Sequence, residues 1–183
     1  MEYEYRNATS GPCARCDANC CKNYIVCITA NDLLRLADYT KSTEWADAVP
    51  SHLILNPPTS GFFLYDRGKP VEFFLCLKRD NRECCVFLND ENLCSVYEAR
   101  PLLCRAYPFE KSGSSIVYKK NFRCPSRWEL DKKTLDDFTN AVKKHEEEAA
   151  EYGKWCREWN ALYAKEGTFE GFINFLIEKA RKK

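Results

Sequence analysis

The chain has 183 residues, with 28 basic against 27 acidic side chains, and 12 cysteines beside two histidines and one methionine. This balanced charge gives a nucleic-acid partner no electrostatic support, and no apolar run reaches the roughly 18 residues that a membrane span needs. The first residues, MEYEYRNATSGPC, lack a signal-peptide pattern, so we expect a cytoplasmic protein. In such a protein, clustered cysteines favour metal binding over structural disulfides.

Short elements are predicted for the first two thirds of the chain. Thr29 is a suitable N-cap with Asp32 three residues later, which predicts a short helix directly after Cys27. A second short helix is predicted over Ser42–Val49. Predicted strands follow at Phe62–Tyr65 and Val71–Leu77, at Cys85–Leu88 and Leu93–Tyr97 as a second hairpin, and at Ser115–Lys119.

The C-terminal third is predicted to be helical. Apolar side chains from Leu135 to Tyr163 recur at alternating spacings of three and four residues, which is typical of a helix that packs lengthwise on another. A last helix begins at Gly167-Thr168, and the short connection predicts an antiparallel pair. The pair would cover the rest of the chain in a monomer, whereas pairing between two copies would give a dimer.

The sequence therefore predicts an α+β fold that is mostly helical. An irregular cysteine-rich metal-binding core with short β-hairpins occupies residues 1–130, and residues 131–183 form a helical extension packed on it.

The first cysteine group is Cys13-x2-Cys16-x3-Cys20-Cys21. Its first three thiols can converge on one centre because the loops between them are short. Cys20 and Cys21 are adjacent, and in an extended segment their side chains would point to opposite sides. We interpret this pair as evidence for two metals, a multinuclear cluster, or one ligand beside one structural thiol.

A second, distant group completes the candidate set of eight ligands, enough for two four-ligand centres. The candidates are Cys13, Cys16, Cys20, Cys21, Cys85, Cys94, Cys104 and Cys124. Cys27, Cys76 and Cys156 lie in apolar patterns and are predicted to be core residues. Cys84 adjoins Cys85 and is an alternative to it.

The ordered series CxxCxxxCC, CVFL and CSVYEARPLLCRAYPF resembles the YkgJ-type cysteine-cluster family, described as zinc- or iron-chelating. The resemblance covers residues 13–124, and RPLLCRAYPF is its most specific part. The flagellin lysine-methylase family carries a similar cluster. The resemblance thus implies a metal cofactor and leaves open whether the protein is an enzyme.

Three neighbours of Cys104 are candidates for contacts around the metal: Arg100, Arg105 and Tyr107. A guanidinium beside a thiolate cluster offsets its negative charge and donates to sulfur. The alternative is that both arginines form ordinary surface ion pairs.

The cofactor predicted here is iron–sulfur, as two [4Fe–4S] clusters or one larger cluster, with zinc as the alternative. More than four thiols, no histidine near them, and a proline directly after Cys124 favour iron. We expect a redox or catalytic metalloprotein that acts on a small molecule or protein. The alternatives are a protein-modifying enzyme of lysine-methylase type and a partner-binding module with structural zinc.

Overall fold

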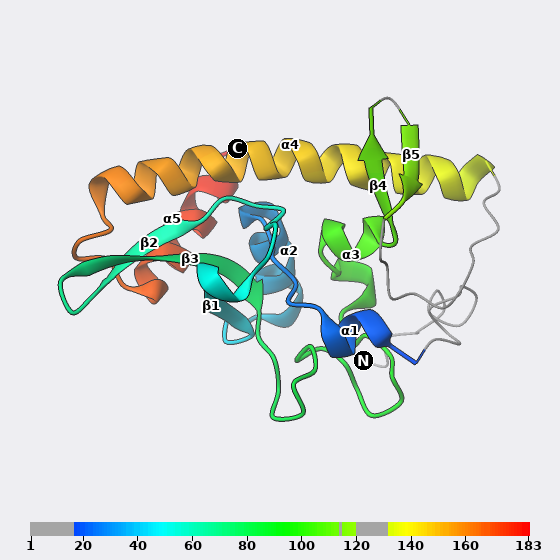
Figure 1. The fold of residues 1–183 in the computed structure, drawn as a ribbon, viewed down its shortest axis with the longest axis horizontal. Helices are drawn as coiled ribbons and strands as arrows, with labels where there is room; N and C mark the ends of the chain where they lie inside the picture. Colours follow the sequence, from blue (N-terminus) through cyan, green and yellow to red (C-terminus); the bar gives the residue numbers. More distant parts are fainter. Residues whose placement is uncertain (1–16, 114, 120–131) are drawn as a thin grey trace.

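The computed structural model describes residues 17–113, 115–119 and 132–183. Its longest element is α4, Lys132–Leu162, which runs along the upper part of the view in Figure 1. Beneath it lie a three-stranded sheet, the helices α2 and α5, and a separate part built from α1, α3 and loops.

The larger sheet is antiparallel with the order β1-β3-β2. Its strands are β1, Ala46–Pro50; β2, Phe62–Asp66; and β3, Lys69–Leu77. The β2–β3 hairpin confirms the two strands predicted there. It turns at Arg67 and Gly68, both with positive φ (51° and 79°), a backbone geometry that glycine adopts without strain.

The prediction of a helix over Ser42–Val49 is wrong. This segment forms β1, in which Ala46 pairs with Leu77 and Val49 pairs with Phe74. Pairing with the central strand outweighs the weak helical pattern of so short a segment. Pro50 ends the strand at the edge of the sheet.

The other predicted hairpin, Cys85–Leu88 with Leu93–Tyr97, is also wrong as a pair of strands. Only isolated bridges occur there, Arg79 with Cys85 and Leu88 with Cys94. The segment ends in a short 3-10 helix, η3, Tyr97–Ala99. A second small sheet pairs β4, Phe109–Ser112, with β5, Ser115–Tyr118, where one strand was predicted.

The predicted helix after Cys27 is confirmed as α2, Ala30–Thr40. The Thr29 hydroxyl accepts the Asp32 N–H at 3.2 Å, and the Asp32 carboxylate accepts the Thr29 N–H at 3.1 Å. These reciprocal bonds form a capping box, which satisfies two backbone donors at the start of the helix.

The C-terminal helices confirm the predicted antiparallel pair. The second of them is α5, Phe169–Arg181, capped by Thr168. Lys179 and Lys183 form ion pairs with Glu158 and Glu151 of α4, so the two helices run in opposite directions. Their shared aromatic side chains reach the sheet, where Phe62 stacks on Phe172 with ring centroids 3.8 Å apart.

The main core lies between the sheet, α2, α4 and α5. Its fully buried members include Leu33, Phe62, Leu75, Tyr152, Phe172 and Leu176. Within the part of the chain that the structure describes, no helix is long and apolar enough to cross a membrane.

Candidate metal centre

The vicinal cysteines lie in a short helix and not in an extended segment. This helix is α1, Asn19–Asn23, and the Tyr24 N–H donates to the Cys20 carbonyl at 2.9 Å as it ends. The sulfurs of Cys20 and Cys21 are 3.9 Å apart. The expectation that the two side chains point to opposite sides is therefore wrong, because helical geometry replaces the alternation of a strand.

The loop that follows β3 brings Cys85 beside α1. The Cys85 N–H donates to the Cys21 carbonyl at 2.8 Å. Arg79 also holds the end of α1, because its guanidinium donates to the carbonyls of Tyr24 at 2.9 Å and of Lys22 at 3.0 Å. Sequence reasoning missed Arg79, since nothing in the local pattern separates it from a surface arginine.

Cys94 is placed by a tight turn. The Asn89 side-chain carbonyl accepts the N–H groups of Glu91 at 3.0 Å and of Leu93 at 2.8 Å. Such bonds from an asparagine to its own loop offer the backbone an alternative to strand pairing. They explain why the predicted hairpin is reduced to isolated bridges.

Cys104 lies in α3, Leu102–Ala106. The first backbone N–H of this helix, from Leu102, donates to the buried Asp32 carboxylate at 2.9 Å. Asp32 therefore caps α2 and also holds the start of the helix that carries Cys104. The capping pattern in the sequence indicated its first role and gave no sign of the second.

These segments enclose one cavity of about 440 Å³, whose lining includes five of the eight predicted ligands: Cys20, Cys21, Cys85, Cys94 and Cys104. The other three, Cys13, Cys16 and Cys124, lie outside the described residues. The remaining described lining is mostly apolar and contains no histidine, aspartate or glutamate. The structure thus brings the described cysteines of both groups to a single place, where sulfur is the main metal donor.

The cavity is wider than a site for one ion. Among the residues that the structure describes, no three His, Cys, Asp or Glu side chains stand close enough together to hold one metal ion. The assignment of these cysteines as ligands stays a prediction.

Burial dominates the electrostatics of these thiols. It raises the pKa of Cys85 to about 11, raises the pKa of Cys94, and holds the pKa of Cys104 well above its ordinary value. Repulsion between neighbouring thiolates acts in the same direction. A hydrogen bond with Cys21 lowers the pKa of Cys20 to about 7 and raises that of Cys21. A bound cation would lower the pKa values of these thiols, because it stabilises every thiolate at once.

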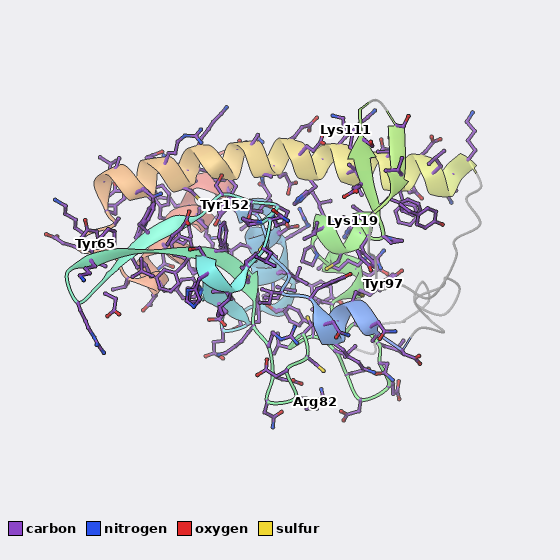
Figure 2. The ribbon with its side chains drawn as sticks, in the orientation of Figure 1. Tyr65, Arg82, Tyr97, Lys111, Lys119 and Tyr152 are labelled. Atoms are coloured by element: carbon purple, nitrogen blue, oxygen red, sulfur yellow. The ribbon has the colours of Figure 1, made fainter. Side chains whose placement is uncertain are left out.

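Arg100 supplies positive charge at the cavity. Its guanidinium lies 3.9 Å from the centre of the Tyr97 ring, and its charge opposes the rise that burial causes in the pKa values of Cys94 and Cys104. Figure 2 shows Tyr97 in the part of the molecule occupied by α1 and α3, where Lys119 also reaches the lining.

The other two predicted neighbours have different surroundings. The Arg105 guanidinium donates to the carbonyls of Arg100, at 3.1 Å, and of Glu98, so it holds the chain that carries Arg100. Tyr107 lines the cavity, with its hydroxyl 3.4 Å from that of Tyr24. Both placements are next to Cys104, and contact with a metal ligand stays a prediction for each.

Of the adjacent Cys84 and Cys85, Cys85 lines the cavity and Cys84 does not. The Cys84 thiol points to the Arg82 carbonyl at 3.5 Å, at the outer loop labelled by Arg82 in Figure 2. Cys27, Cys76 and Cys156 are buried, as expected of core residues.

Comparison with known proteins identifies the class. A family model described as "CxxCxxCC: Putative zinc- or iron-chelating domain" matches residues 12–156. The chain belongs to this cysteine-cluster family, and the match supports metal binding by its cysteines. Searches of the curated proteins and of the solved structures found no match.

Proposed function

We propose that the cavity holds an iron–sulfur group and that the protein is a redox or catalytic metalloprotein. The observation that supports this most is the group of five predicted cysteine ligands in a single cavity, to which α1, the loops after β3 and α3 all contribute. Soft thiolates select iron–sulfur clusters, zinc or Cu(I), and exclude magnesium and calcium.

The size of the cavity favours a cluster over a single ion. Five of the predicted ligands line a cavity of about 440 Å³, yet among the described residues no three His, Cys, Asp or Glu side chains stand close enough to hold one metal ion. A cluster of several metal atoms can bind cysteines that are spread around a cavity, whereas one zinc ion needs four donors at about 2.3 Å. Cys13, Cys16 and Cys124 would complete eight donors, enough for two [4Fe–4S] clusters or one larger cluster.

The chain's own residues would set the properties of this group. Arg100 offsets negative charge at the sulfurs, and the apolar walls, among them Val26, Phe87 and Leu103, limit the access of water. Both are recognised means of tuning a reduction potential. When bound, the group would supply one-electron transfer, and the remaining open space would admit a small molecule or a segment of a partner protein.

Structural zinc is the second candidate. It is supported by the loops that carry Cys85 and Cys94, which have isolated bridges and turns where a sheet was predicted. Loops of this kind gain order when a metal joins them. The lysine-methylase alternative depends on resemblance alone, and likeness between folds is weak support for a reaction.

The test is anaerobic purification of the full chain, followed by analysis of iron, zinc and acid-labile sulfide and by an absorption spectrum. We expect iron and sulfide in comparable amounts and an absorption band near roughly 400 nm from thiolate bound to iron. Zinc without iron or sulfide, in a folded and colourless protein, would overturn the iron–sulfur proposal in favour of the structural-zinc alternative.

A further inference from the structure

A pair of buried cysteines lies beside the candidate metal centre and belongs to neither of its two cysteine groups. Cys27 precedes α2, and Cys76 is in the central strand β3. They face one another in an isolated antiparallel bridge. The sulfurs are 3.6 Å apart, with the Cys76 thiol donating to that of Cys27.

The backbone around the pair has the geometry that a cross-strand disulfide needs. The flanking bonds run from the Ile28 N–H to the Leu75 carbonyl and from the Leu77 N–H to the Val26 carbonyl, both at 2.9 Å. Cys27 and Cys76 therefore occupy a non-hydrogen-bonded position, where the Cα atoms stand about 4.5 Å apart and side chains are close. This falls within the range of about 4.4 to 6.8 Å in which two cysteines can be bridged without backbone movement.

The pair is buried in mostly apolar surroundings, with the Thr59 side chain beside Cys27 and Asp47 paired with Cys76 across the sheet. Cys27 and Cys76 are 1% and 0% exposed, and with Phe74 they form a small buried cluster apart from the main core. Cys27 also contributes to the lining of the thiol cavity, whereas Cys76 lies behind it. Of the two cysteines, Cys27 is therefore the one that borders the space a small molecule would occupy.

We propose that Cys27 and Cys76 are a redox-active dithiol that forms a cross-strand disulfide when a hydroperoxide enters the thiol cavity. The pair is separate from the eight predicted metal ligands, so the proposal does not depend on which metal the protein binds.

The reaction balances with hydrogen peroxide as the oxidant. The Cys27 thiolate attacks one peroxide oxygen, the O–O bond breaks, and hydroxide leaves and takes up a proton to become water. The resulting Cys27 sulfenic acid is then attacked by the Cys76 sulfur, which loses its proton. The S–O bond breaks, a second water leaves, and the disulfide forms. Two thiols have together given two electrons to one peroxide.

The roles of the two sulfurs follow from their hydrogen bond. The bond donated by Cys76 lowers the pKa of Cys27 against the opposing effect of burial, and it raises the pKa of Cys76. Cys27 is thus the sulfur that attacks the peroxide, since the thiolate is the nucleophile. Cys76 is the sulfur that resolves the sulfenic acid.

The disulfide would join α1 to the central sheet. Cys27 follows α1, which carries Cys20 and Cys21, and Cys76 belongs to the strand that both other strands pair with. Oxidation would close a covalent loop between these two positions and reduce the freedom of the unfolded chain. We therefore expect a higher thermal midpoint for the oxidised protein.

The test maps disulfides in the wild-type protein and so needs no variant that might fail to fold. The metal-loaded full chain is treated with one equivalent of hydrogen peroxide, its free thiols are alkylated in denaturant, and unreduced peptides are analysed by mass spectrometry. We expect a peptide pair joined through Cys27 and Cys76, two hydrogen masses lighter than the reduced pair, which disappears on treatment with dithiothreitol. Full alkylation of both cysteines after the peroxide is consumed would overturn the proposal, as would a bridge from Cys27 to a cavity cysteine in place of Cys76.

Two variants assign the roles. Cys156→Ser changes another buried cysteine and should form the bridge at the wild-type rate. Cys76→Ser should stop at the Cys27 sulfenic acid, which dimedone traps. Trapping of Cys76 in place of Cys27 in the corresponding Cys27→Ser protein, with none in Cys76→Ser, would overturn the assigned order of attack.

Discussion

Two regions of this molecule are held together by different forces. The sheet region, made of β1 to β3, α2, α5 and the second half of α4, buries aromatic and aliphatic side chains in a continuous core. The thiol region, made of α1, residues 78–101 and α3, adds Cys85, Phe87, Val96 and Ala99 to the same core and is otherwise joined by single hydrogen bonds such as those of Arg79 and Asp32. The first region is stabilised by burial of apolar area, whereas the second surrounds a cavity of thiols that repel one another once ionised. We therefore expect the second region to gain more order from a cation than the first.

The largest effect should come from removing one cavity thiol. Cys104→Ser should lose most of the bound metal together with the yield of folded protein, because metal binding and folding are coupled in such sites. Cys156→Ser is the matched control, a buried cysteine of the sheet region, and should keep the wild-type metal content. Metal analysis of both proteins tests this prediction. Equal losses of metal would show that both regions depend on the metal to the same extent.

The second prediction concerns pH. The pKa of Cys85 is raised to about 11 and that of Cys104 well above its ordinary value, so both are protonated at neutral pH without metal. Ligation must remove these protons, and affinity should fall as pH falls, about tenfold per pH unit for each proton released. Cys20, with a pKa of about 7, releases about half a proton at pH 7. Competition with a chelator for zinc at pH 6, 7 and 8 measures this, and equal affinities would contradict it.

A third prediction addresses the sheet region alone. Phe62 is fully buried and stacked on Phe172, so Phe62→Ala should lower the free energy of unfolding by about 3–5 kcal/mol. Leu162→Ala, on the exposed end of α4, should change it by less than about 0.5 kcal/mol. Denaturant titration gives both values. Metal content per folded molecule should remain unchanged in each, and a loss in Phe62→Ala would mean that the sheet core controls the cavity.

The smallest effect is expected from a charge beside the cavity. Arg100→Gln removes the guanidinium that favours the thiolates of Cys20, Cys94 and Cys104, and should weaken metal binding by about tenfold. Arg181→Gln, an exposed arginine paired with Asp38, is the control and should bind metal like the wild type. Identical affinities for the two variants would place Arg100 among ordinary surface arginines.

The sequence predicted the regular elements where local chemistry and pattern agree. The capping residues Thr29 and Thr168 marked the starts of two helices, and the run from Leu135 marked the long one. The β2–β3 hairpin was visible from Gly68 between two apolar runs. In each case, residues near in sequence supply the decisive interactions.

The wrong predictions fall where strands distant in sequence, or hydrogen bonds from side chains, determine the backbone structure. β1 exists because β3 offers a pairing edge that no local pattern indicates. The hairpin predicted around Cys85 and Cys94 was displaced by bonds from Asn89 to its own loop. The gathering of five predicted ligands at one cavity followed from composition and spacing, whereas the contributions of Arg79 and Asp32 depend on contacts across the fold.

The shared carboxylate of Asp32 has a mechanical consequence. It belongs to the first turn of α2 and accepts the first N–H of α3, so a ligand-bearing helix and an ordinary one are joined through a single side chain. Cys104 would hold a metal from α3, so any shift of α3 on metal binding would bear on α2 through that bond. Because α5 packs against α2, the same bond links the candidate metal centre to the C-terminal helix.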